Sequence, residues 1–308
     1  MLFEGTHVNM PMHAHEIPIS DDVVRGLITP QFPQWSSLPI RRFASSGTVN
    51  AIFRIGDDLA ARFPLRMADP VEIRAWLHRE ADAASQLANH SPVPTPVPVS
   101  LGEPGPGYPL PWSVQTWLPG TDATVADPGG SIDFAHDLAA FIATLRTVDT
   151  GNRHFGGTNR GGDIQRHDAW VQTCLQNSED LLDVPPLRKL WRRLRDLPRD
   201  APDVMTHSDL IPGNVLVADG RLAGVLDGGG FGPADPALDV IAGWHLLDDE
   251  ARTVFRKELG CDDLEWERSK AWAFEQSMGL IWYYADSNPV MSEMGRRTLQ
   301  RIVNDSQT

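Results

Sequence analysis

Three side chains that carry oxygen ligands, Asp209, Asn214 and Asp227, surround a short segment with the pattern of a β-hairpin. Between Asn214 and Asp227 lie two apolar runs separated by Asp219-Gly220, and an Asp-Gly pair between apolar runs is a strong hairpin signal. Because a hairpin returns to its starting end, we expect Asn214 and Asp227 to lie at the same end of the ribbon.

Carboxylate and amide oxygens at one end of a ribbon suit a hard divalent cation such as Mg²⁺ that bridges phosphate groups. Asp209, a few residues before Asn214, is placed to accept the proton of an attacking hydroxyl group. The pattern predicts phosphoryl transfer, with Asp209 as the catalytic residue and Asn214 and Asp227 as metal ligands. Polar residues that merely flank a hairpin would explain any one of these positions, but not the whole arrangement.

The elements that must position these residues fall into a β-rich first part and a mostly helical second part. In the first part, a helix is expected from a cap at Asp69-Pro70 to about Asn89. The Gly- and Asn-rich region 150–162 is expected to be a long loop. The strands expected in the first part are 40–43, 50–55, 59–63 and 112–118, and the helices expected in the second part include 134–148, 168–182 and 187–197.

Composition excludes several classes of protein. The chain has 308 residues, 41% hydrophobic and 22% charged, with a net charge of −14. A nucleic-acid-binding protein normally carries a basic footprint, so we expect no nucleic-acid partner. Two cysteines are too few for a disulfide framework. No signal peptide or membrane-spanning stretch is recognisable, so we expect no membrane partner and a cytoplasmic location.

The sequence resembles the aminoglycoside phosphotransferases and related small-molecule kinases, which have a protein-kinase-like fold. Residues 207–217 (HSDLIPGNVLV) look like their catalytic loop, and Leu226-Asp227 followed by residues 235–239 (DPALD) looks like their metal-binding segment. Residues 46–50 (SGTVN) and 60–64 (AARFP) resemble the nucleotide loop and third strand. Residues 112–120 (WSVQTWLPG) resemble the hinge between the lobes.

The resemblance implies an α+β fold with two lobes. The β-rich N-terminal lobe would span residues 1–118, with an extension over 1–35, and the helical C-terminal lobe would span 119–308. It also implies Mg²⁺ as cofactor and ATP or GTP as co-substrate. The nucleotide-binding residues that it implies are Ser46, Gly47, Thr48, Arg62, Glu80, Thr116, Leu118 and Leu216.

Two departures from the family pattern concern phosphate and metal binding. The family usually has a lysine on the third strand, but the first lysine of this chain is Lys189, so Arg62 is expected to replace it. Arginine can hold phosphate oxygens through its planar fork and stays charged. Three glycines, 228–230, follow Asp227 where an aromatic residue is common, and they are expected to loosen the packing of that segment.

The resemblance predicts an enzyme that phosphorylates a hydroxyl group of a small, possibly cationic molecule. An aminoglycoside antibiotic is the family's usual acceptor. The alternatives are a macrolide kinase, a metabolic kinase acting on a sugar or amino alcohol, and a nucleotide-binding member with weak activity. Acidic and aromatic residues are frequent in the C-terminal helices, but they do not identify the substrate, and we assign no substrate residues.

Overall fold

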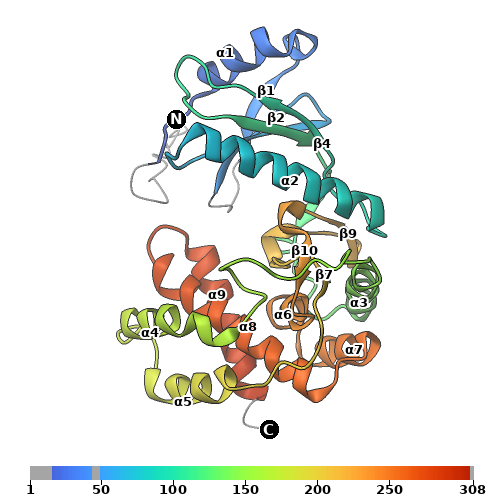
Figure 1. Cartoon of the computed structure of the whole chain (residues 1–308), viewed down its shortest axis with the longest axis vertical. Coiled ribbons are helices and arrows are strands. Elements are labelled where there is room, and N and C mark those ends of the chain that lie inside the picture. Colours follow the sequence, from blue (N-terminus) through green and yellow to red (C-terminus); the bar gives the residue numbers. More distant parts are fainter. Residues whose placement is uncertain (1–15, 44–48, 306–308) are drawn as a thin grey trace, which may run out of the picture.

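The computed structural model describes residues 16–43 and 49–305. The first part of the chain forms an antiparallel five-stranded sheet in the order β1-β2-β3-β5-β4. One long helix, α2 (Pro70–His90), lies beside it (Figure 1). The strands are β1 (Ile40–Phe43), β2 (Asn50–Ile55), β3 (Leu59–Pro64), β4 (Pro98–Gly102) and β5 (Trp112–Thr116).

A helix that the sequence pattern did not predict, α1 (Asp21–Gln31), packs on this sheet. Its side chains Val24, Leu27 and Ile28 are buried in the same apolar cluster as the strand residues. The second half of the expected 1–35 extension is thus part of the core of the first lobe. The expected cap of α2 is confirmed, because Asp69 Oδ1 accepts a hydrogen bond of 2.8 Å from the Val71 N–H.

The second part of the chain is mainly helical, and Figure 1 shows its helices below the sheet. Two small sheets, β6-β8-β9 and β10-β7, belong to it. The helices are α3 (Ile132–Arg146), α4 (Asp168–Asn177), α5 (Val184–Arg195), α6 (Ala237–Leu246), α7 (Asp249–Leu259), α8 (Asp263–Tyr283) and α9 (Pro289–Asp305). The short strands are β6 (Thr121–Asp122), β7 (Val204–Thr206), β8 (Val215–Ala218), β9 (Arg221–Val225) and β10 (Gly232–Ala234).

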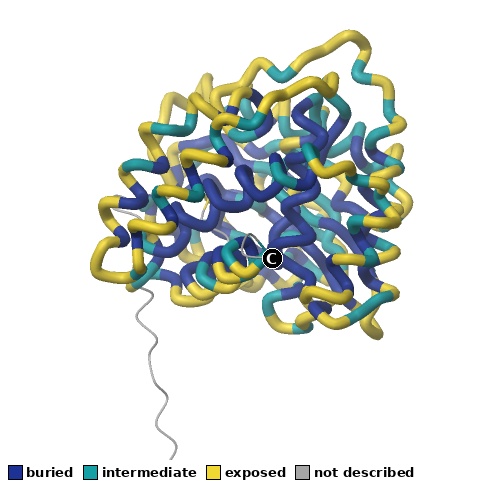
Figure 2. The backbone as a smooth tube through the Cα atoms, turned by 90° about the horizontal axis from the view of Figure 1, so that it is seen from below, coloured by how far each residue is buried: buried dark blue, intermediate teal, exposed yellow. Residues whose placement is uncertain are grey.

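The core of this second lobe is built around α6 and α8. Every residue of α6 is buried, as are most of α8. Seen from below, the buried backbone fills the middle of the molecule and exposed residues form its rim (Figure 2). The fold is therefore the predicted α+β arrangement, with a β-rich N-terminal lobe and a helical C-terminal lobe. One helix is shorter than expected: α4 ends at Asn177 rather than Leu182, because residues 178–182 form turns.

Candidate active site

The predicted hairpin is present and brings the expected ends together. Strands β8 and β9 pair antiparallel, with Val215 opposite Val225, and the turn lies at Asp219-Gly220. The Leu226 N–H donates a hydrogen bond of 2.7 Å to the carbonyl oxygen of Asn214. This backbone hydrogen bond holds Asp227, the next residue, close to Asn214.

Asp209 lies beside Asn214, as the spacing predicted. The Asn214 side-chain amide donates to Asp209 twice, at 3.0 Å to its carbonyl oxygen and at 3.1 Å to its Oδ2 atom. Because the amide nitrogen of Asn214 points at Asp209, its Oδ1 atom is on the opposite branch and is available as a ligand. The other carboxylate oxygen of Asp209, Oδ1, accepts from Arg160 and from Gln276, each at 3.0 Å.

A buried carboxylate accepts hydrogen bonds from the backbone of the loop that carries Asp209. Asp239, on α6, accepts the His207 N–H and the Ser208 N–H, each at 2.8 Å. Burial raises the pKa of Asp239 above its usual range, and these donors oppose that rise. Ser208 has φ +76°, a left-handed conformation that glycine adopts at lower cost than serine. His207 is buried, and its Nε2 atom lies 2.9 Å from the Leu226 carbonyl oxygen, which ties the loop to the segment before Asp227.

Ion pairs connect the expected phosphate-binding cation of the N-terminal lobe with acids of both lobes. Arg62, on β3, lies 2.7 Å from Asp227 Oδ1 through Nη2, and 3.7 Å from Glu80 Oε2 through Nη1. Burial alone would lower the pKa of Arg62, but the charges of Asp227 and Glu80 raise it above its ordinary value. Burial raises the pKa of Glu80 to about 7, Asp227 adds to that rise, and Arg62 opposes it. The cation expected on the third strand is therefore paired with both the predicted metal ligand and the helix acid.

The glycines after Asp227 are closely packed, contrary to the expectation of a loose segment. A Cβ atom on Gly228 would come within 2.5 Å of Leu87 Cδ2, and one on Gly229 within 2.9 Å of Glu80 Cγ. A Cβ atom on Gly230 would come within 2.5 Å of Ser208 Oγ. The glycines thus allow this short 3₁₀ turn to approach both α2 and the catalytic loop.

A cleft of about 250 Å³ between the lobes contains most of the predicted site residues. Arg62, Asp209, Asn214 and Asp227 all line it. The predicted nucleotide-binding residues Thr116, Leu118 and Leu216 line it as well, and Glu80 lies behind Arg62. Sequence reasoning missed several apolar wall residues, whose ordinary types gave no signal. These are Phe43, Ile52, Ala60, Leu226 and Met291.

Two backbone N–H groups of the expected hinge segment already donate hydrogen bonds within the protein. The Thr116 N–H already donates to the Val97 carbonyl oxygen at 2.9 Å, and the Trp117 N–H donates to that of Asp58 at 2.7 Å. Leu118 is the next residue of this segment that lines the cleft. The expected phosphate-loop residues 46–48 lie outside the described residues.

The donor set of the cleft fits Mg²⁺ held jointly by protein and phosphate. In the part of the chain that the structure describes, no group of three or more His, Cys, Asp or Glu side chains could hold a metal ion. Mg²⁺ does not require such a group in phosphate-transfer sites, where one or two side-chain oxygens share it with substrate phosphates and water. Asn214 and Asp227 are the side chains that would supply those oxygens.

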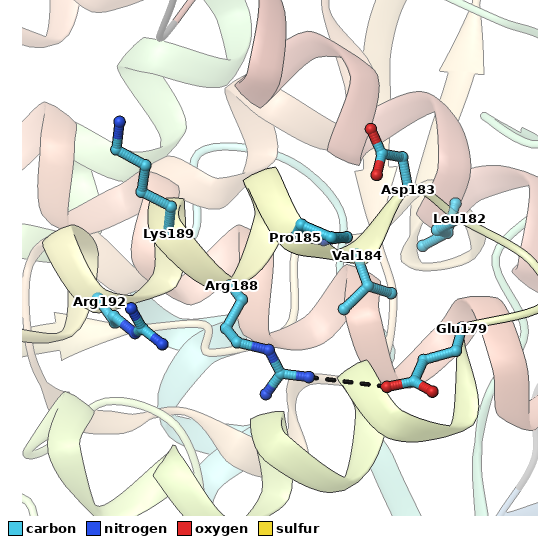
Figure 3. A pocket seen from close by; sticks show the side chains of 8 residues that line it. All are labelled: Glu179, Leu182, Asp183, Val184, Pro185, Arg188, Lys189 and Arg192. Carbon is cyan, nitrogen blue, oxygen red and sulfur yellow. Dashed lines mark ion pairs between the residues drawn. The ribbon is translucent and has the colours of Figure 1, made fainter.

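A larger hollow of about 620 Å³ lies at the start of α5 (Figure 3). It is lined by basic residues of α5, including Arg188, which faces Glu179 at 3.9 Å. None of the predicted site residues lines it. The larger hollow is therefore not the candidate active site. The smaller cleft is, because the predicted site residues line it.

Comparison with known proteins agrees with this geometry. The sequence profile of the phosphotransferase enzyme family matches residues 40–272, which include the sheet, the predicted catalytic loop and about half of α8. The chain belongs to this family. Aminoglycoside 3'-phosphotransferases of Escherichia coli and Salmonella typhimurium are each 27% identical to it over 147 residues, or 45% of this chain. The matched region spans 53% of those relatives, so about half of their length is compared.

Solved structures of the phosphotransferase family share the fold over nearly the whole chain. The GDP and kanamycin complex of APH(2")-IIIa has a TM-score of 0.68 at 18% identity, covering 91% of this chain and 98% of that one. The macrolide 2'-phosphotransferase MphH from Brachybacterium faecium has a TM-score of 0.60 at 20% identity, covering 90% and 98%. Among the described residues of this family member, no helix is both long and apolar enough to cross a membrane.

Proposed function

We propose that this protein is a kinase that transfers the γ-phosphate of ATP or GTP to a hydroxyl group of a small molecule. The observation that carries the proposal is the meeting of Asp209, Asn214, Asp227 and Arg62 in one cleft. These are a proton acceptor, two oxygen ligands for Mg²⁺ and a cation for phosphate, which together are the parts that phosphoryl transfer requires. A nucleotide-binding protein without activity would not need the proton acceptor.

In the proposed reaction, the acceptor hydroxyl oxygen attacks the γ-phosphorus in line with the leaving nucleoside diphosphate. A new bond forms between that oxygen and phosphorus, the bond from phosphorus to the bridging oxygen of the β-phosphate breaks, and the hydroxyl proton passes to Asp209. Arg62 holds phosphate oxygens through its guanidinium fork. Asn214 and Asp227 would hold Mg²⁺, which supplies positive charge to the phosphate oxygens when bound.

The nucleotide base is proposed to lie against the segment that joins the lobes. Leu216 forms the apolar floor, and Thr116 and Leu118 face the base with backbone groups. Because the Thr116 N–H is already bonded, Leu118 is the expected backbone donor. The lobes are proposed to divide at 118/119, which is supported by Thr121 pairing with Val217 of β8. The amides of Ser46, Gly47 and Thr48 are proposed to face the phosphates.

The proposed acceptor is an aminoglycoside-type antibiotic, in keeping with the names of the curated relatives. A macrolide is the second candidate, because a macrolide 2'-phosphotransferase shares the fold. A metabolic sugar or amino alcohol is the third. A cytoplasmic location is also proposed, because ATP and GTP are available there.

Mass spectrometry of a mixed pool tests the proposal. The protein is incubated with Mg²⁺, ATP or GTP, and a pool of aminoglycosides, macrolides and small alcohols. The Asp209→Asn variant serves as a control, and the Asp219→Asn variant, altered in the exposed hairpin turn, serves as a matched control. We expect one compound to gain a phosphate with the wild type and Asp219→Asn but not with Asp209→Asn. Equal phosphorylation by Asp209→Asn would refute the role of Asp209.

A further inference from the structure

The carboxylate of Asp209 is held by two side chains that the motif does not include. Arg160 lies in the loop before α4, and Gln276 lies in the middle of α8. Both donate hydrogen bonds of 3.0 Å to the same oxygen, Asp209 Oδ1. The donors are 49 and 67 residues away from Asp209 in the sequence, on opposite sides of it.

The orientation of the Gln276 side-chain amide follows from its partner Asp209. A carboxylate only accepts hydrogen bonds, so the amide nitrogen of Gln276 must face Asp209 and its Oε1 atom must face away. That Oε1 atom lies 3.0 Å from His245 Nε2. His245 must therefore carry its proton on Nε2.

The other nitrogen of His245 completes the chain of donors. Burial lowers the pKa of His245 to about 3, so at neutral pH the ring carries one proton only. With that proton on Nε2, the Nδ1 atom accepts from the Thr298 hydroxyl at 2.8 Å. Thr298 and His245 are both buried. A directed chain thus runs from Thr298 on α9 through His245 on α6 and Gln276 on α8 to Asp209.

Arg160 also forms an ion pair with a buried carboxylate, Glu275. Its Nη1 atom lies 3.8 Å from Glu275 Oε2, and the Glu275 side chain is only 6% exposed. The other oxygen of Glu275 accepts a hydrogen bond of 2.9 Å from His167 Nδ1. Glu275 and Gln276 are neighbours on α8. Both donors to Asp209 therefore depend on this helix, Gln276 directly and Arg160 through Glu275.

We propose that Arg160 and Gln276 are positioning residues for phosphoryl transfer, because together they anchor Asp209 Oδ1 and leave Oδ2 to receive the acceptor hydroxyl. This inference rests on the proposed function. Oδ1 accepts from two protein donors, while Oδ2 accepts from Asn214 at 3.1 Å and lies on the metal-ligand side of the carboxylate. Rotation of the carboxylate is resisted because it would break two hydrogen bonds at once.

Steady-state kinetics of four variants tests the inference. Arg160→Met removes the partly exposed donor to Asp209, and Gln276→Met removes the buried one. Arg160→Lys keeps both a hydrogen-bond donor and a positive charge. Arg153→Met is the matched control, because Arg153 lies in the same loop but contacts Gln86 and Met205 instead. We expect Arg160→Met and Gln276→Met to lower kcat about 100-fold, the scale expected when a reacting group is misplaced.

The pattern of effects separates positioning from mere structural support. We expect the nucleotide Kd to stay at the wild-type value, Arg160→Lys to restore much of kcat, and Arg153→Met to behave as the wild type. The double variant Arg160→Met/Gln276→Met should lose less than the product of the single losses, because both side chains act on one oxygen. Wild-type kcat in either Met variant, or an equal loss in Arg153→Met, would overturn the inference.

A crystal structure of the double variant decides the inference without using activity. We expect the Asp209 carboxylate to be rotated away from its wild-type orientation while the β8-β9 hairpin is unchanged. A carboxylate in the wild-type orientation would overturn the inference, whatever the kinetics. If instead the wild type phosphorylates no compound, the proposed function fails, and the orientation of Asp209 still shows whether Arg160 and Gln276 anchor it.

Discussion

Arg62 Nη2 lies 2.7 Å from Asp227 Oδ1, so a cation of the N-terminal lobe is bonded to a carboxylate of the C-terminal lobe. The same guanidinium faces Glu80 at 3.7 Å, and its side chain is only 12% exposed. Two acids thus share one arginine at the place where the proposed Mg²⁺ and phosphates bind. A cation bound at Asp227 Oδ1 would compete with Arg62 for that oxygen, whereas the second oxygen of the carboxylate, Oδ2, can bind a cation while Oδ1 stays with Arg62.

Replacement of Arg62 should affect both folding and nucleotide binding. Arg62→Met leaves Glu80 and Asp227 without their cation, and we expect a cost of about 1–2 kcal/mol, less than for a fully buried pair because the Asp227 side chain is 44% exposed. We expect a lower free energy of unfolding in urea and loss of Mg·ATP and Mg·GTP binding by calorimetry. Arg62→Lys keeps the charge and should retain part of the affinity. Arg54→Met is the control, since Arg54 pairs with the exposed Asp57 on the same sheet; a similar loss there would contradict the assignment.

Asp227→Asn should remove the dependence of nucleotide affinity on Mg²⁺. The amide keeps the shape of the side chain but lacks the charge that attracts a divalent cation. Titration calorimetry with ATP and GTP, each with and without Mg²⁺, measures the effect. We expect Mg²⁺ to strengthen binding to the wild type but not to the variant. A variant whose affinity still rises with Mg²⁺ would show that Asp227 is not a ligand.

Loss of the Glu80 proton should make the nucleotide-free protein less stable as the pH rises from about 4.5 to about 7. The pKa of Glu80 is about 7 in the folded protein, against a reference of 4.5, so the folded state binds the proton more tightly than the unfolded state. The stability contributed by this group is complete below the lower value and is lost through the upper one, by at most about 3 kcal/mol.

Glu80→Gln removes that titration and leaves the other groups in place. Urea unfolding at several pH values between 4.5 and 7.5, in the absence of Mg²⁺ and nucleotide, measures the difference. We expect the free energy of unfolding of the variant to fall less than that of the wild type over this range. Parallel curves for the two proteins would mean that Glu80 does not titrate there. Glu72→Gln, altered in the exposed first turn of α2, provides the control.

The parts of the site that could be predicted are those encoded locally. The turn at Asp219-Gly220 determines which residues meet at the ends of the hairpin, and the cap at Asp69 determines where α2 begins. Arg160 and Gln276 could not be predicted, because arginine and glutamine are common on protein surfaces and no spacing connects them with Asp209. Their contact depends on the packing of α8 beneath the catalytic loop. The expected looseness of the glycines was wrong for the same reason, since the facing residues of α2 are remote in the sequence.

Gly229→Ala should weaken nucleotide binding through Glu80. The added Cβ atom would lie 2.9 Å from Cγ and 3.0 Å from Cδ of Glu80, so the acid must move away from its place beside Arg62. Because Arg62 loses one of its two partners, we expect its guanidinium to be less well placed for phosphate. The Kd for Mg·ATP or Mg·GTP should rise about tenfold, equivalent to about 1.4 kcal/mol, while the protein stays folded.

Two variants separate this effect from a general disturbance of the glycine segment. Gly232→Ala places a methyl group where the nearest atom, the Gly230 carbonyl oxygen, is 3.7 Å away, an ordinary contact, and it should bind nucleotide as the wild type does. Gly229→Ala combined with Glu80→Ala removes the two closest contacts, those to Cγ and Cδ of Glu80, and leaves only the contact of 3.1 Å to Cβ. If the displaced acid is the cause, adding Gly229→Ala to Glu80→Ala should have little further effect on the nucleotide Kd. A full additional tenfold loss would mean that Gly229 acts through the backbone beside Asp227 instead.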